Sequence, residues 1–481
     1  MDIGPLRRHS IITFTSVIGL TIIGFVSTMY FAHVVGPAVL GAYFLFLAYL
    51  GIFNLIGEGG FGDAVVKRIS EGIEKNEYFS AFFVLRILLI IFSVAAVYIY
   101  QGSLKDLASS DLVEWLILAL VVSGLEQIAR YGVYGIDKVG VNQAGNLIST
   151  IVRVGIQVAA VAIGYGAAGL VGGVIAGFVV SGAINFHFLK LSITRFTLRH
   201  VQNLLFFSFW ICITAGGVLV YTYADTVIIG YYLSNTEVGI YRAVFQFTTA
   251  AIFVALTMRT VLYPKISYMG TRGEYTKIES HISRAITFSL LLAVPICIGG
   301  WVLGDSMLFY FYGAAFTEGT TTLFILLAMQ VINIFMYLEI MCLNAVDMPK
   351  EAFIATFIGL FANVVLDIVL IPYWGITGAA FATLISLAMN VILAYCALKG
   401  KMSVKFEKSP IFHILAAGFL MGIFLVVYRV LVSFTSFWHL AVALVVGLVL
   451  YLFLILRFDA GIRDDIKHIA TDIGIKWPVW L

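Results

Sequence analysis

The chain has 481 residues, of which 61% are hydrophobic and only 11% charged, with a formal net charge of +3. A soluble protein needs roughly a quarter of its residues charged to cover its surface. The composition therefore excludes a water-soluble globular protein and predicts an all-α protein whose main solvent is lipid.

Fourteen apolar runs of about 18 or more residues recur along the chain, each long enough to cross a hydrocarbon layer of about 30 Å as a helix. They lack the alternation of barrel strands and are too long to be such strands. The first run follows basic residues, as in a signal peptide, but it is too long and has no small-residue cleavage site, so we expect it to be retained. In chain order the predicted membrane helices span residues 9–33, 38–60, 79–100, 112–134, 141–164, 168–189, 203–231, 236–262, 281–304, 318–344, 350–371, 376–398, 410–432 and 437–457.

The loops between these runs are short and carry no motif of a soluble catalytic domain. No Walker A motif, no HExxH and no paired-carboxylate loop is present, so we expect neither an enzyme nor a metal site. The four cysteines, Cys212, Cys297, Cys342 and Cys396, fall inside predicted helices without a CxxC spacing. We interpret them as packing residues rather than as disulfide or zinc ligands.

Basic residues are concentrated in every second loop, which fixes the predicted orientation. With Arg7 and Arg8 in the cytoplasm, the outer loops hold only Lys105 and Arg429. The protein is therefore predicted to lie in the cell membrane with both termini cytoplasmic, and its positive charge to face anionic lipid rather than nucleic acid. The cytoplasmic loops and tail are predicted to carry Lys67, Arg68, Lys75, Arg130, Lys138, Lys190, Arg195, Arg199, Arg259, Lys265, Arg272, Lys277, Arg284, Lys350, Lys399, Lys401, Lys405, Lys408, Arg457, Arg463, Lys467 and Lys476.

Two Gly-rich turns resemble each other across the chain: YGAAGLVGG at 165–173 and WGITGAAFA at 374–382. The glycines allow a tight reversal and close helix packing. The alignment places Gly166 against Gly375, Gly169 against Gly378, Asp137 against Asp347 and Lys67 against Lys265, and it places VLGAYFLFL (39–47) against EVGIYRAVF (237–245).

These anchors predict two copies of a six-helix unit. Because six is even, both copies face the same way, as in secondary transporters with parallel repeats around a central cavity. The predicted parts are an N-lobe at 1–200, a C-lobe at 201–400, and helices 13 and 14 with a cytoplasmic tail at 401–481.

Four motifs carry a family resemblance: GEGGFGDAVVKRISEG (57–72), VGIYRAVFQF (238–247), LNAVDMPKEA (343–352) and WGITGAAFAT (374–383). Together with the helix count, they resemble the polysaccharide-export branch of the multidrug/oligosaccharidyl-lipid/polysaccharide flippase superfamily over about residues 9–400. The resemblance implies a transporter that moves a lipid-linked oligosaccharide or related polysaccharide precursor to the outer leaflet by alternating access. It implies a lipid-linked glycan and membrane lipid as partners, with glycan assembly enzymes as further candidates. It implies no cofactor and leaves coupling to Na⁺ or H⁺ open.

Three arginines within the spans are the candidate ligands of a phosphate headgroup: Arg86, Arg153 and Arg242. A charge inside a membrane helix is costly, which makes each a functional hypothesis, and a guanidinium offers two parallel donors to phosphate. Each also has a structural alternative: Arg153 pairing with Glu126, Arg86 reaching the interface, and Arg242 pairing with Asp225. Lipid-intermediate flippases carry cavity cations on their first two helices, whereas this chain has none between Arg8 and Lys67.

Four acids are candidates for ion coupling or structural pairing: Glu126, Asp225, Glu339 and Asp367. A fifth, Glu58, lies among glycines at the inner end of helix 2, where it is either a gate or a plain helix terminus. The rival function is a cation-coupled multidrug or metabolite exporter of the same superfamily. Such exporters often rely on an acid in helix 1, and residues 9–33 contain none. A polytopic transferase and a scaffold for envelope assembly are the alternatives from other classes.

Overall fold

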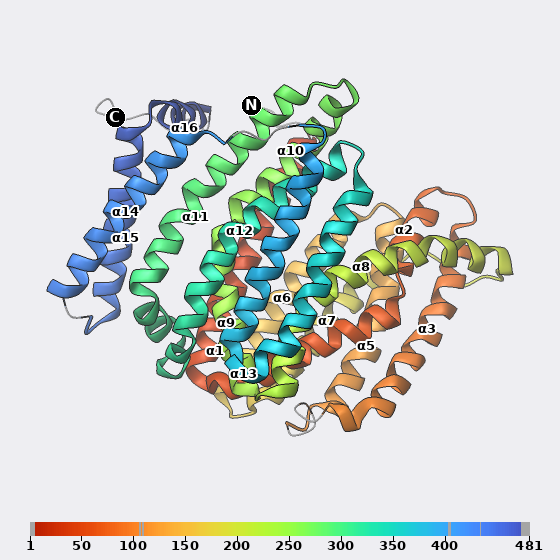
Figure 1. Cartoon of the computed structure of the whole chain (residues 1–481). Helices are drawn as coiled ribbons and strands as arrows, with labels where there is room; N and C mark the ends of the chain where they lie inside the picture. Colours follow the sequence, from red (N-terminus) through yellow and green to blue (C-terminus); the bar gives the residue numbers. More distant parts are fainter. Residues whose placement is uncertain (1–4, 105–106, 108–109, 403–405, 433, 473–481) are drawn as a thin grey trace. The chain divides into compact units, whose positions relative to one another are not determined.

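The computed structural model describes residues 5–104, 107, 110–402, 406–432 and 434–472, and all regular structure among them is helical (Figure 1), as predicted. Lys105, Lys405 and Lys476 lie outside the described residues, as do the side chains of Arg7 and Arg8. The helices are α1 (Pro5–Glu58), α2 (Phe61–Ser70), α3 (Lys75–Tyr100), η1 (Gln101–Ser103), α5 (Val113–Gly135), α6 (Val139–Ala162), α7 (Gly166–Phe188), α8 (Leu198–Tyr232), α9 (Asn235–Thr248), η2 (Thr249–Ile252), α10 (Phe253–Thr271), α11 (Tyr275–Tyr312), η3 (Ala314–Gly319), α12 (Thr320–Ala345), α13 (Pro349–Lys399), α14 (Lys408–Leu431), α15 (Phe437–Phe458) and α16 (Ala460–Asp472).

Eleven helices within the described residues are long and apolar enough to cross a membrane, so the chain is a multi-pass membrane protein. Two of them each join two predicted spans across a kink at a glycine with positive φ, Gly36 (74°) in α1 and Gly375 (57°) in α13. Helix α8 covers the predicted run 203–231, and α9, η2 and α10 together cover 236–262. The predicted series of spans is therefore found in order.

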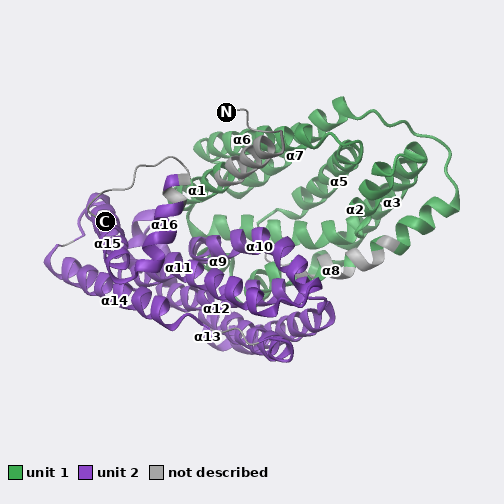
Figure 2. Cartoon of the chain, turned by 90° about the horizontal axis from the view of Figure 1, so that it is seen from above, with its two compact units in different colours: residues 1–242 green, residues 243–481 purple. Residues whose placement is uncertain are grey.

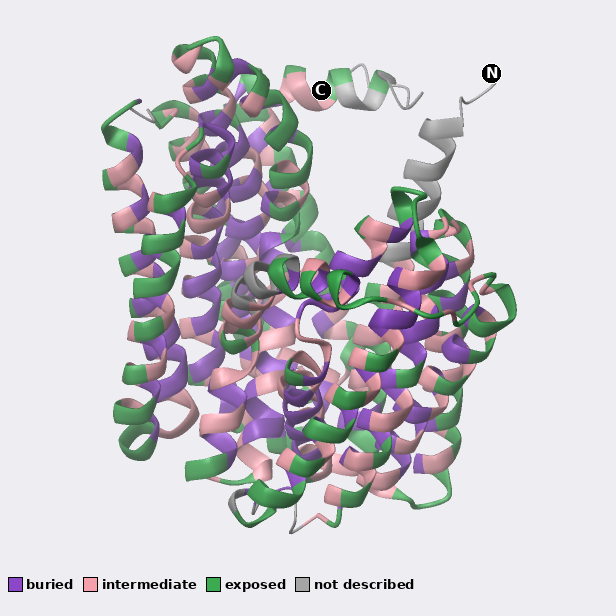
Figure 3. Ribbon diagram, turned by 90° about the vertical axis from the view of Figure 1, so that its right-hand side faces the viewer, coloured by how far each residue is buried: buried purple, intermediate pink, exposed green. Residues whose placement is uncertain are grey.

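The chain divides into two compact units, residues 1–242 and 243–481 (Figure 2). In unit 1 an apolar core joins α2, α3, α5 and α8 through residues such as Phe61, Phe82 and Leu204. In unit 2 a larger core, including Ile286 and Leu338, joins α10 through α15. Many exposed residues, including large hydrophobic ones, lie along the outer faces of the helices (Figure 3). Lipid is the expected solvent of these faces. The predicted lobe boundaries at 200 and 400 follow the sequence repeat rather than packing, and they stay a prediction.

Backbone geometry supports the predicted repeat at the aligned positions. Gly166 and Gly375 have φ of 52° and 57°, and the aligned aspartates Asp137 and Asp347 have φ of 61° and 60°. A positive φ is rare for a residue with a side chain, although aspartate tolerates it better than most. The same unusual conformations thus occur at matching places in the two copies.

A second repeat pair is in direct contact within unit 1. Helices α1 and α9 cross so closely that a Cβ on Gly41 would lie 1.6 Å from the Asn235 carbonyl oxygen. A Cβ on the aligned Gly239 would lie 2.0 Å from the Pro37 carbonyl oxygen. Only glycine permits such an approach of two backbones, so the two equivalent segments meet at their equivalent glycines.

Candidate functional site

The interior of unit 1 holds a buried cation on α3. The Arg86 side chain is 1% exposed, and its Nη2 donates a hydrogen bond of 2.8 Å to Gln127 Oε1 on α5. Nε and Nη1 have no hydrogen-bond partner among the described residues. The alternative that Arg86 reaches the membrane interface is therefore wrong, because neighbouring helices cover the whole side chain.

Glu58 ends α1 beside this arginine. The helix stops because Gly59 and Gly60 both take positive φ, at 56° and 73°. The Glu58 carboxylate accepts a hydrogen bond from the Tyr131 hydroxyl on α5. The predicted gating role stays a prediction, and the arrangement itself is that of an anchored helix terminus.

Glu126 pairs with Arg130 rather than with Arg153. The two side chains approach to 3.3 Å one helical turn apart on α5, and Ser181 Oγ donates to the same carboxylate at 2.8 Å. Arg130 had been predicted in a loop, yet it lies within α5, and its guanidinium lies 4.6 Å from the centre of the Tyr131 ring. The acid is thus part of a structural network.

Arg153 lies on α6 against the glycines of α7. A Cβ on Gly177 would be 3.3 Å from the Arg153 Cβ, and one on Gly173 would be 2.9 Å from the Arg153 carbonyl oxygen. The small residues predicted to allow close packing therefore hold the arginine-bearing helix in place. The Arg153 Nε is buried without a hydrogen-bond partner among the described residues.

Arg242 stands in an aromatic setting at the end of unit 1. Its guanidinium lies 5.9 Å from the centres of both the Phe44 and the Tyr223 rings, and Nη1 donates to the Thr222 carbonyl at 3.3 Å. Asp225 accepts a hydrogen bond of 2.5 Å from the hydroxyl of Tyr241, the residue that precedes Arg242. The candidate cation and the candidate acid thus belong to one cluster.

The other two candidate acids are buried in unit 2. Asp367 on α13 is fully buried, one turn after Asn363, whose amide donates to Thr383 Oγ1 at 3.4 Å. Glu339 on α12 is 4% exposed, and its Oε2 has no hydrogen-bond partner among the described residues. Buried carboxyls are costly when charged, so both residues stay candidates for ion coupling.

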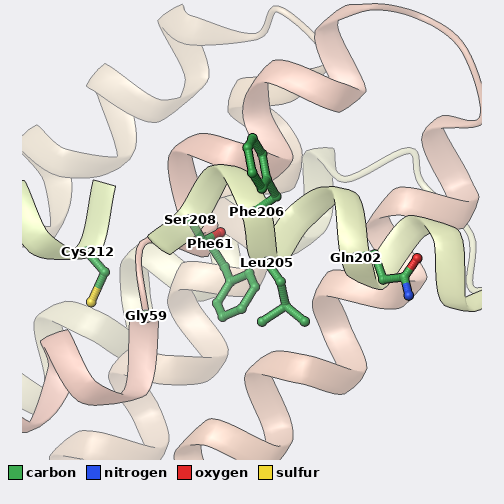
Figure 4. A pocket seen from close by; sticks show the side chains of 7 residues that line it. All are labelled: Gly59, Phe61, Gln202, Leu205, Phe206, Ser208 and Cys212. Carbon is green, nitrogen blue, oxygen red and sulfur yellow. The ribbon is translucent and has the colours of Figure 1, made fainter. Parts of the chain in front are cut away.

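One cavity in unit 1 has an apolar lining. It has a volume of about 530 Å³ and lies between the break after α1 and the first half of α8. Figure 4 shows Phe61 and Leu205 on one side of the α8 ribbon and Phe206 on the other. The lining carries no charged side chain, so this cavity does not suit an ionic headgroup. Its lining residues are Gly59, Phe61, Gln202, Leu205, Phe206, Ser208 and Cys212.

A cavity in unit 2, which we name the Arg259 pocket, has a lining of mixed polar and apolar groups and a volume of about 630 Å³. The prediction placed Arg259 in a cytoplasmic loop, whereas the structure places it well inside α10. The signal that identifies it was present in the sequence, because the predicted run 236–262 already includes this arginine. The pocket is lined by Arg259, Thr260, Tyr263, Pro264, Asn344 and Pro349.

Known proteins resemble the chain over most of its length. A curated relative from Haloferax volcanii, the probable low-salt glycan biosynthesis flippase Agl15, is 29% identical over 98% of this chain and 100% of its own. The probable flippase AglR of the same organism is 25% identical over 82% of this chain and 83% of its own. Lipid II flippase MurJ, in an inward closed conformation, superposes with a TM-score of 0.79 at 20% identity, over 95% of this chain and 100% of MurJ.

Two family models match the chain. The MatE model matches residues 211–369, and a multidrug resistance MATE transporter in an inward-facing conformation has the same fold, with a TM-score of 0.61 at 14% identity over 79% of this chain and 95% of its own. The model described as polysaccharide biosynthesis protein matches residues 6–269, more than half of the chain. The chain is therefore a member of the polysaccharide biosynthesis protein family, within the superfamily of flippases and multidrug exporters that its sequence motifs resemble.

Proposed function

We propose that this protein moves a lipid-linked oligosaccharide, or a related polysaccharide precursor, from the cytoplasmic to the outer leaflet by alternating access. The observation that carries the proposal is the end-to-end similarity to a curated probable glycan flippase, over 98% of this chain. In the proposed orientation both termini are cytoplasmic and the protein lies in the cell membrane, with glycan assembly enzymes as its partners.

The interior of unit 1 supports this function. A sugar–phosphate headgroup loses its hydrogen bonds to water when it enters hydrocarbon, at a cost of several kcal/mol for each unsatisfied group. Arg86, Arg153 and Arg242 offer guanidinium groups inside or beside the spans. A guanidinium keeps its charge when buried and binds phosphate through parallel donors, so it replaces part of the lost hydration.

The carboxyl groups of Asp225, Glu339 and Asp367 are the proposed coupling sites. Each is buried within or beside a membrane helix, where binding a proton or Na⁺ removes the cost of the charge. If such a carboxyl is exposed to each side of the membrane in turn, it binds the ion on one side and releases it on the other. The ion gradient then drives the conformational cycle. We propose H⁺ or Na⁺ as the coupling ion.

A cation-coupled exporter is the second candidate, favoured by the match of residues 211–369 to the MatE model. The two functions differ in the substrate, because an exporter releases a soluble cationic or amphipathic compound, whereas a flippase keeps the lipid anchor in the bilayer. Transport of a polyprenyl-linked sugar therefore separates them.

The test is translocation in proteoliposomes that contain the full-length protein and a fluorescent polyprenyl-phosphate-linked sugar. Loss of fluorescence to a membrane-impermeant quencher reports the rate at which headgroups appear outside. Arg153→Ala and Arg242→Ala are expected to slow this rate while the protein stays folded. Arg429→Gln is the matched control, because Arg429 forms its ion pair with Asp305, at 2.6 Å, within unit 2 and is not among the candidate ligands of the headgroup. Vesicles in which wild-type protein moves no labelled headgroup would refute the flippase assignment.

A further inference from the structure

We propose that unit 1 binds an anionic membrane phospholipid where the connection between α7 and α8 meets the apolar cavity of α8. The phosphate contacts basic side chains of this connection, residues 189–197, which we name the strap, and an apolar chain of the lipid enters the cavity. This inference goes beyond the proposed function, because the ligand is a lipid of the bilayer and not the transported substrate. It assigns a lipid site to the segment that joins the two predicted repeats.

The strap is an extended segment held against α3. The backbone amide of Ser192 donates to Asn76 Oδ1 at 3.1 Å. The backbone amide of Thr194 donates to Ser80 Oγ at 2.8 Å. The Phe196 ring packs against the apolar core of unit 1. Because α3 binds two of its amides and the core takes one of its rings, the strap presents its other side chains at fixed positions.

Two cations of the strap have no acidic partner. Lys190 and Arg195 are exposed, and no acid lies within ion-pair distance of either in the described part of the chain. Glu74, which precedes α3, already pairs with Arg199 at 3.0 Å. A Lys or Arg close to an anionic lipid surface strengthens binding about fivefold. The strap therefore offers the phosphate of a lipid two positive charges that the protein itself does not neutralise.

The first turns of α8 expose large apolar side chains beside these cations. Leu198 is 70% exposed and Phe206 is 77% exposed, whereas Leu204 on the opposite side of the helix is buried in the core of unit 1. Figure 1 shows this part of α8 running across the end of α3 rather than alongside it. A helix that lies across the ends of membrane spans, with exposed apolar side chains and flanking cations, is typical of the membrane interface.

The cavity at this part of α8 suits an apolar chain. Its volume of about 530 Å³ lies within the range of small-molecule sites, about 300–1,000 Å³. Leu205 and Phe61 line it from the same side of the α8 ribbon (Figure 4). At about 3.6 residues per turn, Leu198, Gln202 and Leu205 lie on one face of α8. This face therefore runs from the strap to the cavity, as the headgroup and the chain of one lipid require.

A phospholipid is the ligand that fits both halves of the site. An anion without a chain would leave the cavity unfilled, and a neutral lipid would leave Lys190 and Arg195 without a counter-charge. Membrane phospholipids also outnumber any lipid-linked precursor, so mass action favours them at a site that opens to the bilayer. In the proposed orientation the strap faces the cytoplasm, so the lipid belongs to the inner leaflet, where anionic headgroups attract basic segments.

The first experiment titrates the full-length protein in detergent with phosphatidylglycerol or with phosphatidylcholine of the same chains, and it follows the bound lipid by native mass spectrometry. We expect phosphatidylglycerol to bind more tightly than phosphatidylcholine. Arg195→Gln is expected to weaken phosphatidylglycerol about fivefold and to leave phosphatidylcholine unchanged. Arg272→Gln is the matched control, because Arg272 is an exposed arginine on the turn after α10, outside the site.

A second pair of variants tests the place of the chain. Leu205→Ser makes the cavity wall polar, so it is expected to weaken both lipids by a similar factor, about threefold or more. Leu88→Ser is the matched control, because Leu88 is 57% exposed on α3 and does not line the cavity. The control is expected to bind both lipids as the wild type does.

The outcomes decide the headgroup, the chain and the source of the lipid separately. Equal binding of the two lipids by the wild type, or equal binding by Arg195→Gln and Arg272→Gln, would overturn the assignment of the strap. Equal binding by Leu205→Ser and Leu88→Ser would overturn the assignment of the cavity. A polyprenyl-phosphate-linked sugar at equal mole fraction is expected not to displace phosphatidylglycerol, and displacement would show that the site takes the transported lipid instead. None of these measurements involves translocation, so a failure of the flippase assignment would leave this site intact.

Discussion

Two aligned stretches of unit 1 share a backbone and differ in chemistry: GAYF at 41–44 and GIYR at 239–242. Their glycines, Gly41 and Gly239, are in contact where α1 crosses α9. Two residues further along, Tyr43 accepts a hydrogen bond of 3.2 Å from Gln157, whereas Tyr241 donates to Asp225.

The last position of the two stretches differs most. Phe44 ends the first copy and Arg242 ends the second, and the guanidinium of Arg242 lies over the ring of Phe44. The repeated backbone thus brings equivalent positions together. Because one copy has Phe44 and the other has Arg242 at the aligned position, a cation lies against an aromatic ring where the two copies are in contact. Parallel repeats generate a polar site in this way without changing the helix packing.

The largest expected effect comes from breaking the shared backbone contact. The Cβ of a side chain at residue 239 would lie only 2.0 Å from the Pro37 carbonyl oxygen. Because that oxygen belongs to the backbone, it cannot move aside as a flexible side chain does. We expect Gly239→Leu to cost more than about 3 kcal/mol of stability, the upper range for overpacking. Thermal unfolding in detergent checks this against Gly155→Leu on α6, where nothing lies within 4 Å of an added Cβ. Equal melting temperatures for the two variants would show that the helices do not cross at this glycine.

The next effect concerns the position at which the copies differ. Arg242→Phe makes the second stretch end as the first does, so it keeps the apolar bulk and removes the charge. We expect headgroup translocation in vesicles to slow at least about tenfold, which corresponds to about 1.4 kcal/mol in the barrier. Phe44→Leu removes only the ring under the guanidinium and is expected to cost about 0.5–1 kcal/mol, a loss of a few-fold. If Arg242→Phe transports at the wild-type rate, the difference between the copies has no role in transport.

Removing the hydroxyl of each aligned tyrosine, Tyr43 or Tyr241, is expected to lower stability by a smaller amount, and by different amounts in the two copies. Tyr241→Phe removes a donor from a carboxylate, and hydrogen bonds to charged groups contribute about 1.5–3 kcal/mol. Tyr43→Phe removes an acceptor from a neutral amide that still donates to the Leu170 carbonyl at 2.7 Å, so its cost is expected to be about 0.5–1.5 kcal/mol. The measurement is the difference in melting temperature between the two variants under identical conditions. A larger loss for Tyr43→Phe would contradict the assigned partners.

Sequence reasoning succeeded where hydropathy and glycine geometry decide the structure. Runs of apolar residues locate the spans because lipid demands them, and Gly166 and Gly375 mark turns because few other residues take their φ. The repeat alignment depended on these same glycines and on Asp137 and Asp347, which is why it extends to the backbone conformation.

The candidate site was harder to predict, because burial depends on neighbouring helices that a single sequence does not reveal. Arg86 lies near a predicted span end, where a long side chain usually reaches water, yet α5 covers it. Arg259 was counted with the cytoplasmic loop although the predicted run 236–262 includes it, and α10 continues past that run to Thr271. Hydropathy marks the part of a helix that lies in lipid, and it does not mark the length of the helix.

The smallest expected difference is that between the two repeated turns. Gly166 and Gly375 have φ of 52° and 57°, and an added Cβ at residue 166 meets only Val39, at 3.9 Å. The cost of Gly166→Ala is therefore backbone strain alone, about 1–2 kcal/mol. Gly375→Ala is expected to cost about the same if the turns are equivalent. Gly172→Ala on α7 is the control and is expected to be nearly neutral, because its Cβ would make an ordinary contact of 3.6 Å with Trp115. Equal losses at 166 and 375, with none at 172, would show that both copies keep their turn for its backbone geometry. A loss confined to one turn would mean that the two copies have diverged in backbone as well as in side-chain chemistry.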